Sequence, residues 1–208
     1  MVGDNAAALK EFLAAAERAR ARTNLTLNSR ALYKAGDMEF RLTHYLAAAT
    51  NYQAALDSVS GIPAARAEIG DRALYQTAHA AVRLGDLKLA SKALTGLGAE
   101  FASSPRYARA ALMVGQALSG AGRHDQALTV YSSCLERLEK LKEETPVKAE
   151  LMLAMSATYG AKGDWPHAIA AVEAWLGAEN NAKHPLSARA EFELGRLKAL
   201  SGLSLIHI

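Results

Sequence analysis

Cysteine and long apolar runs are scarce in this 208-residue sequence, and each scarcity excludes a class of protein. The single cysteine, Cys134, excludes an intrachain disulfide and a zinc site built from several thiolates. No window holds the roughly 18 apolar residues of a membrane-spanning helix, so we expect no membrane insertion by this chain. The first turns carry Asp4, Lys10 and Glu11 where a secretory signal would be apolar. The cellular compartment therefore stays open.

Clustered positive charge is also missing. The formal charge of +3 arises from 24 basic and 21 acidic residues that are spread along the whole chain. A phosphate-binding surface needs lysine and arginine aligned on one face, so nucleic-acid binding is the least favoured function. The longest charged stretch, residues 136–144, alternates in sign and is typical of a solvated helix face.

Motifs for catalysis or cofactor binding are likewise absent from the sequence. No HExxH pair, phosphate-binding loop, dinucleotide fingerprint or nucleophile elbow occurs. The six histidines are scattered singly, at positions 44, 79, 124, 167, 184 and 207. We therefore predict no catalytic residue, no metal site, no cofactor and no enzymatic activity.

The residues that are abundant favour helix. The chain holds 45 alanines against 21 valine, isoleucine and threonine residues together. Alanine loses no side-chain entropy in a helix, whereas β-branched residues do. The composition predicts an all-α fold.

A repeat emerges when segments are aligned on a small or polar turn residue that is followed five positions later by alanine. The turn residues are Gly3, Thr50, Gly85, Gly122 and Gly163, with Gly202 as a sixth. Another small residue stands seven positions before most of them, at Thr43, Ala78, Gly115, Ser156 and Gly195. Because helices approach closely only where side chains are small, we expect this residue and the alanine after the turn to face each other across one helix crossing.

This spacing resembles the tetratricopeptide repeat, most clearly at residues 111–135 and 190–202. The resemblance implies a right-handed α-solenoid of antiparallel helical hairpins, and the long units are similar to those of bacterial cell-envelope members. It predicts ten helices in a single domain over residues 1–202, because hairpins that cannot bury their apolar faces alone must stack. The predicted hairpins cover residues 29–49 with 51–60, 66–84 with 86–101, 106–121 with 124–142, and 147–162 with 165–177, flanked by half units at 4–22 and 185–201. Loops are expected at 103–105, 143–146 and 177–185.

The two ends depart from the repeat. Neither half unit has a polar capping helix, so we expect a fragment of a longer protein whose uncapped ends permit self-association. Residues 203–208 (LSLIHI) lose the repeat chemistry and are interpreted as a non-native tail. The alternative is a short apolar tail that packs on the last helix.

The resemblance also indicates where a partner binds, because the first helices of such hairpins line a groove. Counting from each turn residue, the groove-facing residues are Phe40, His44, Arg72, Tyr75, His79, Arg83, Arg109, Gln116, Phe192 and Arg196, together with Asp37, Leu112, Glu150, Leu153 and Arg189. We expect a scaffold or adaptor that binds a protein or peptide carrying acidic and apolar groups. Two alternatives stay open: these residues are ordinary solvated positions, or the chain is an accessory module of a larger protein.

Overall fold

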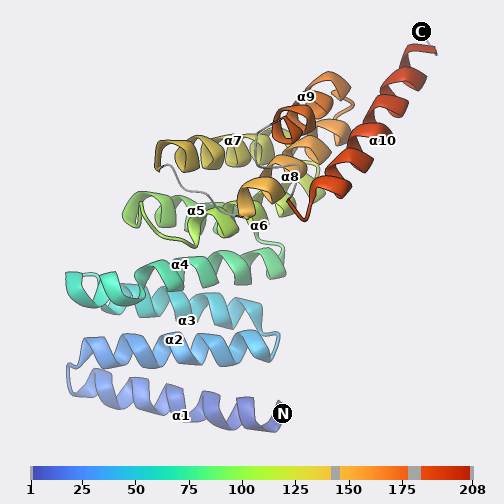
Figure 1. The fold of residues 1–208 in the computed structure, drawn as a ribbon. Coiled ribbons are helices and arrows are strands. Elements are labelled where there is room, and N and C mark those ends of the chain that lie inside the picture. The colour runs from blue at the N-terminus through green and yellow to red at the C-terminus, as the bar shows by residue number, and fades with distance from the viewer. Residues whose placement is uncertain (1, 142–145, 178–183, 207–208) are drawn as a thin grey trace. The chain divides into compact units, whose positions relative to one another are not determined.

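Ten α-helices and no strand make up the part of the chain that the computed structural model describes, residues 2–141, 146–177 and 184–206 (Figure 1). None of these ten helices is both long and apolar enough to cross a lipid bilayer. The all-α fold of antiparallel helical hairpins is confirmed. The helices are α1 (Val2–Ala21), α2 (Leu25–Arg41), α3 (Tyr45–Ser58), α4 (Pro63–Leu84), α5 (Leu87–Glu100), α6 (Tyr107–Gly120), α7 (His124–Leu141), α8 (Val147–Ala161), α9 (Trp165–Leu176) and α10 (Ser187–Ile206).

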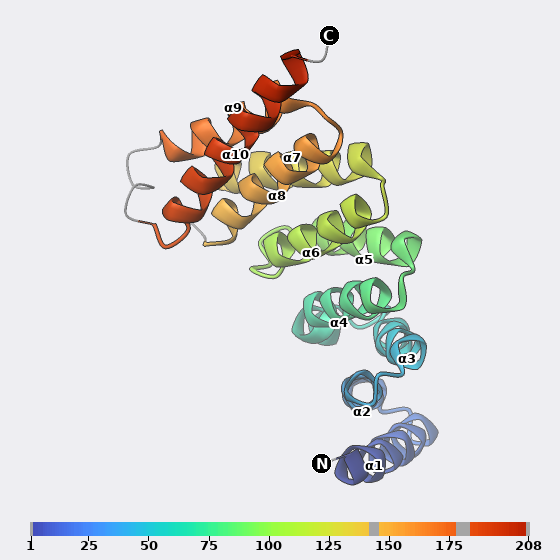
Figure 2. The ribbon, with the colours of Figure 1, turned by 90° about the vertical axis from the view of Figure 1, so that its right-hand side faces the viewer.

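The chain divides into two compact units, residues 1–110 and 111–208, and the division falls inside α6. In the first unit, consecutive helices from α1 to α5 pack side by side, and α2 also contacts α4 (Figure 2). In the second unit, α7 packs on α8, α8 on α9 and α9 on α10. The single domain expected over residues 1–202 stays a prediction.

One turn geometry recurs between paired helices. It places a single residue at positive φ, namely Thr23, Thr43, Gly85, Gly122 and Gly163. The amide of the next residue then donates to a carbonyl five positions back, as Asp86 does to Ala81 at 2.9 Å. At three turns the side chain of that next residue also caps the following helix: Asn24, Asp86 and Asp164 accept from the backbone amides of Leu27, Leu89 and His167. The left-handed residue lets the turn pair carbonyl groups at the end of the first helix, and the capping side chain accepts from an unpaired amide at the start of the second helix.

The first predicted hairpin has the wrong register. The predicted turn residue, Thr50, lies inside α3, and the turn between α2 and α3 is at Thr43, seven residues earlier. The error has a physical reason, because a β-branched residue rarely adopts positive φ and threonine is therefore a weak turn signal. The remaining predicted helix boundaries lie within a few residues of the observed ones.

Two other predicted turn residues lie within helices. Gly3 is in the first turn of α1, and α10 continues through Gly202 to Ile206, beyond the half unit expected at 185–201. The loop expected at 103–105 separates α5 from α6 as predicted. Of the other two predicted loops, residues 143–145 and 178–183 lie outside the described residues, as do residues 207–208 of the expected tail.

The predicted helix crossing is confirmed where hydrogen bonds join its two sides. Ser156, seven residues before Gly163, donates through Oγ to the carbonyl of Ala168, five residues after it, at 2.8 Å. The α1–α2 turn has the same bond in the opposite direction: Nδ2 of Asn28, five residues after Thr23, donates to the carbonyl of Ala16, seven residues before it, at 2.9 Å. The residues before and after the turn therefore touch across the crossing.

Two of the crossings share a further feature, a glycine covered by a tyrosine ring. The Tyr52 ring covers Gly36 so closely that a Cβ added to the glycine would lie 2.7 Å from the nearest ring atom. The Tyr131 ring covers Gly115 in the same way, and there the corresponding distance would be 2.2 Å. In both, the glycine stands seven residues before the turn and the tyrosine nine residues after it. We call this pair the glycine–tyrosine crossing.

Replacing Thr43 by glycine is expected to raise the free energy of unfolding by about 1 kcal/mol, because a threonine held at φ 65° is strained and its exposed side chain adds little packing. The reverse change, Gly122→Thr, introduces the same strain and is expected to lower stability by about 1–2 kcal/mol. Urea denaturation of both variants measures the effects. Equal destabilisation by the two substitutions would contradict this account of the turn.

Candidate binding surfaces

Six side chains of the first unit gather on α2, α4 and the start of α3. Phe40 projects from α2 and Tyr45 from the start of α3, and the other four lie on α4. Because α2 and α4 are in contact, side chains from successive hairpins share this face. We call it the aromatic–arginine surface, consisting of Phe40, Tyr45, Arg72, Tyr75, His79 and Arg83.

Ring contacts join the members of this surface. The Phe40 ring centroid lies 4.6 Å from that of His79 and 5.3 Å from that of Tyr45. Tyr75 adds a tilted contact with His79 at 6.3 Å. The Arg83 guanidinium lies 5.3 Å from the Tyr45 ring centroid and donates to the Tyr45 hydroxyl at 3.0 Å. Arg83 is thereby held in place with its remaining donors available to a ligand.

Most acidic groups of α2 and α4 are neutralised within the unit. Three of the four carboxylates on these helices form ion pairs, namely Asp37 with Lys34, Glu68 with Arg30, and Asp71 with Arg106, while Oε2 of Glu39 lies 2.8 Å from Nδ1 of His44. Arg72 has no hydrogen bond or ion pair within the part of the chain that the structure describes, and it is exposed. The aromatic–arginine surface therefore carries an excess of positive charge from Arg72 and Arg83.

His79 adds a ring and no positive charge near neutral pH. Burial, with a smaller contribution from the nearby Arg83 guanidinium, lowers the pKa of His79 below its usual value. The imidazole is therefore neutral at pH 7 and can accept or donate one hydrogen bond. Attraction for an anionic group comes from the two arginines.

Counting from Thr43 keeps Asp37 and Phe40 as groove positions, adds Arg30, Tyr33 and Arg41, and leaves His44 out. His44 is exposed at the N-cap of α3, and its Nδ1 lies 2.8 Å from Glu39. Counted from Thr43, the fifth groove position is Tyr33, which lies half-buried with its ring 5.4 Å from that of Tyr52. Tyr45 joins the surface through its ring contact with Phe40 and lies outside this count. The signal for the corrected register is present in the sequence, because Gly36, Thr43, Ala48 and Tyr52 repeat the spacing of Gly115, Gly122, Ala127 and Tyr131.

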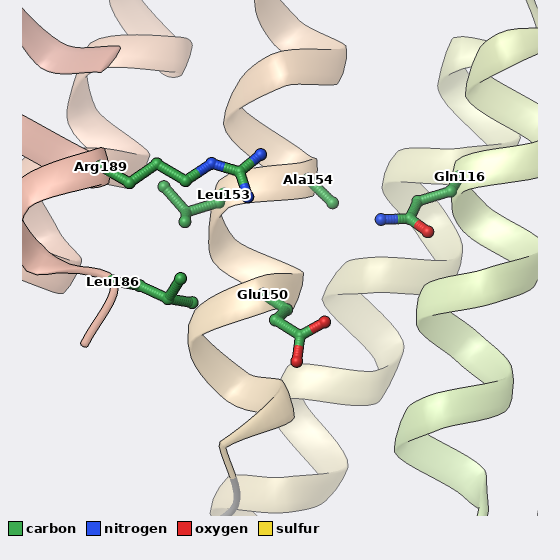
Figure 3. A pocket seen from close by; sticks show the side chains of 6 residues that line it. All are labelled: Gln116, Glu150, Leu153, Ala154, Leu186 and Arg189. Carbon is green, nitrogen blue, oxygen red and sulfur yellow. The ribbon is translucent and has the colours of Figure 1, made fainter. Parts of the chain in front are cut away.

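The second unit holds a small cavity of about 100 Å³. Figure 3 shows the Arg189 side chain reaching across Leu153 toward Ala154, while the Gln116 amide and the Glu150 carboxylate face the space between α6 and α8. We call this the α8 pocket, lined by Gln116, Glu150, Leu153, Ala154, Leu186 and Arg189. Four of the lining residues are groove positions predicted from the repeat spacing, namely Gln116, Glu150, Leu153 and Arg189. Residues selected by their spacing therefore line one cavity.

The other predicted groove residues lie elsewhere. Arg109 is exposed on α6, and Leu112 is buried with 3% of its surface accessible. Phe192 is 70% exposed on α10, outside the α8 pocket, and Arg196 forms an ion pair with Glu193 on its own helix. Cys134 is buried.

No protein-family model matches this sequence, and no curated protein matches it significantly. Solved structures do resemble the fold. BtubC (BKLC) from P. vanneervenii superposes with a TM-score of 0.67 at 16% identity, over 97% of this chain and 83% of that one. The Rap conjugation gene regulator of plasmid pLS20, in complex with the Phr* peptide, gives 0.53 at 19% identity, over 84% of this chain. A Rap protein complexed with Competence and Sporulation Factor gives 0.52 at 14% identity, over 98% of this chain.

This chain covers different fractions of the two Rap proteins. This chain spans 48% of the pLS20 regulator and 73% of the other Rap protein. At these identities the likeness concerns the fold alone. The chain has a tetratricopeptide-like helical-repeat fold.

Proposed function

We propose that this protein is an interaction scaffold that binds an extended or helical segment of a partner protein on the first helices of its hairpins. The observation that carries the proposal is the aromatic–arginine surface, where ring and guanidinium groups from successive hairpins meet on one face. Arginine and aromatic residues are the side chains that contribute most at protein interfaces. The ligand is a segment with acidic and apolar side chains.

Electrostatics favour an acidic ligand. The carboxylates of Asp37, Glu68 and Asp71 form ion pairs with Lys34, Arg30 and Arg106, so Glu68, which also attracts Arg72 electrostatically, is already engaged by another guanidinium. An arginine can hold a carboxylate through two parallel hydrogen bonds. Aspartate or glutamate beside an aromatic residue on the ligand would meet both the charge and the rings.

The α8 pocket suits a smaller group of the same kind of ligand. Its volume of about 100 Å³ is well below that of the usual small-molecule site. Leu153 and Leu186 supply an apolar wall, and Gln116, Glu150 and Arg189 supply donors and acceptors. These groups could contact a single side chain or a peptide group of the ligand, and the cavity is too small for a cofactor.

The comparisons support the proposal by analogy only. Two of the similar structures are complexes, one with the Phr* peptide and one with Competence and Sporulation Factor. From the spacing of its turn residues, we propose that the chain resembles the longer tetratricopeptide repeats of bacterial cell-envelope proteins. The alternative, an accessory module of a larger protein, uses the same surface and is distinguished by the remainder of that protein.

The proposal is tested by selecting binders from a displayed random peptide library and measuring their affinity by fluorescence anisotropy. We expect enrichment of peptides that combine acidic and aromatic residues. The triple variant Arg72→Ala, Tyr75→Ala, His79→Ala should bind them at least about tenfold more weakly, because it removes one charge and two rings from the surface.

The matched control carries three exposed substitutions on α5, namely Lys88→Ala, Lys92→Ala and Thr95→Ala. It should retain full affinity, and circular dichroism should show that both triple variants keep their helix content. Unchanged binding by the Arg72, Tyr75 and His79 variant would refute the aromatic–arginine surface as the binding site.

A further inference from the structure

We infer that the ligand of the aromatic–arginine surface is an extended segment with two acidic residues an even number of positions apart and an apolar side chain between them. This inference rests on the proposed function, and it specifies the backbone conformation and the charge spacing of the ligand. The acidic residues would pair with Arg72 and Arg83, and the apolar side chain would lie on the rings between the two arginines.

The two arginines project from the same side of α4. Arg72 and Arg83 are eleven positions apart, which is close to three full turns of an α-helix. Both are exposed, whereas Leu74 and Ala81 on the opposite side of the helix are buried. At a rise of about 1.5 Å per residue, the α-carbons of the two arginines lie about 16 Å apart along the helix axis.

An aromatic patch separates these two positive charges. Tyr75 and His79 lie between Arg72 and Arg83 along α4, and their ring centroids are 6.3 Å apart. Phe40 of α2 adds its ring, with a centroid 4.6 Å from that of His79. The sequence between the two arginines contains no acidic residue that would repel a carboxylate. The complementary ligand therefore has an acidic group at each end and an apolar group in the middle.

Polar groups on two of the rings favour a ligand with an extended backbone. Within the described part of the chain, neither the Tyr75 hydroxyl nor the His79 imidazole forms a hydrogen bond, and both side chains are half-buried. An extended segment presents backbone N–H and C=O groups that these side chains can bind. A helix has already paired its own backbone groups, so it would leave the hydroxyl and the imidazole unused.

The alternation of side chains along an extended chain makes the spacing even. Residues an even number of positions apart point to the same side, and residues an odd number apart point to opposite sides. At about 3.3 Å per residue, four residues span about 13 Å and six span about 20 Å, which brackets the distance between the arginines. A spacing of five residues spans about 16 Å, but it directs one of the two carboxylates away from the surface.

The inference is tested with labelled peptides of one length and composition, in which two glutamates stand from three to seven positions apart. A phenylalanine is placed two positions after the first glutamate, and serine and threonine fill the other positions. Binding to the full chain is measured by fluorescence anisotropy. We expect the peptides with even spacings to bind at least about tenfold more tightly than those with odd spacings, because only they engage both arginines.

Three outcomes would overturn the inference in different ways. Equal affinity at odd and even spacings would refute the extended, two-point ligand, and if the Arg72→Ala, Tyr75→Ala, His79→Ala variant still bound more weakly, the proposed function would stand. Tighter binding by a stapled helical peptide with glutamates eleven positions apart would refute the extended conformation alone. Failure of every peptide to bind would refute the proposed function together with this inference.

Double-mutant cycles assign each acidic residue to its arginine. In the peptide that binds most tightly, changing either glutamate to glutamine should weaken binding to the wild type about tenfold. With Arg72→Ala, one of these changes should have little further effect, and with Arg83→Ala the other. Lys88→Ala, at an exposed position of α5, is the matched control and should bind every peptide as the wild type does. Coupling of both arginines to the same glutamate would overturn the inference.

Discussion

Gly115→Ala is expected to lower the free energy of unfolding by about 2–3 kcal/mol, whereas Gly195→Ala should raise it by up to about 1 kcal/mol. Both glycines lie inside helices, where alanine is intrinsically favoured. They differ in what the new methyl group meets. At Gly115 it would lie 2.2 Å from Cε1 of the buried Tyr131, and at Gly195 it would meet open space.

A second substitution tests whether the clash with Tyr131 is the cause. Combining Gly115→Ala with Tyr131→Leu reproduces the pairing that the chain uses at Ala78 and Leu94. The double variant should recover part of the stability lost by Gly115→Ala, so the two substitutions should be strongly non-additive. Urea denaturation followed by circular dichroism measures all the variants. Similar effects of alanine at Gly115 and Gly195 would mean that the glycine–tyrosine crossing does not govern packing.

Trp175→Ala should lower the free energy of unfolding by about 3–5 kcal/mol, because it removes the largest buried side chain from the core of the second unit. Trp175 is 5% exposed and packs with Ala149, Ala168, Val172 and others, and the His184 ring meets it edge-on at a centroid distance of 5.4 Å. Trp175→Phe retains most of this contact and serves as the milder control.

The same variant tests whether the two units unfold together. The chain has two tryptophans, so Trp165 alone reports on the second unit after Trp175 is replaced, while far-UV circular dichroism reports on all helices. Neighbouring hairpins in a repeat array stabilise one another, so we expect both signals to fall at one lowered urea midpoint. A second circular-dichroism transition at the wild-type midpoint would show that residues 1–110 unfold independently.

Much of the fold was predictable because its packing depends on short, regular spacings. Glycine at 85, 122 and 163 marks turns by its freedom at positive φ, and the alanines that follow lie where backbones come close. The turn at Thr43 was missed because threonine carries no such signal. Only the complete set Gly36, Thr43, Ala48 and Tyr52, compared with its copy around Gly122, reveals the correct register.

The candidate site was predictable in part for the same reason. Counting from Gly85, where the register is correct, predicts Arg72, Tyr75, His79 and Arg83. The structure places all four on α4 and brings His79 into ring contact with Phe40 and Tyr75. Tyr45 could not be found in this way, since it belongs to a second helix and reaches the surface through its contacts with Phe40 and Arg83. Ion pairing of the acidic side chains depends on rotamers and neighbouring helices, which spacing does not encode.

The most direct test of the proposed binding face is NMR chemical-shift mapping of the labelled protein with a peptide from the acidic–aromatic selection. The account predicts that the largest perturbations occur at Phe40, Tyr75, His79 and Arg83 on α2 and α4. Exposed positions of the second helices, such as Gln53 on α3 and Lys92 on α5, should be unaffected. Perturbations confined to α5 and to the residues of α3 other than Tyr45 would contradict binding on the first helices.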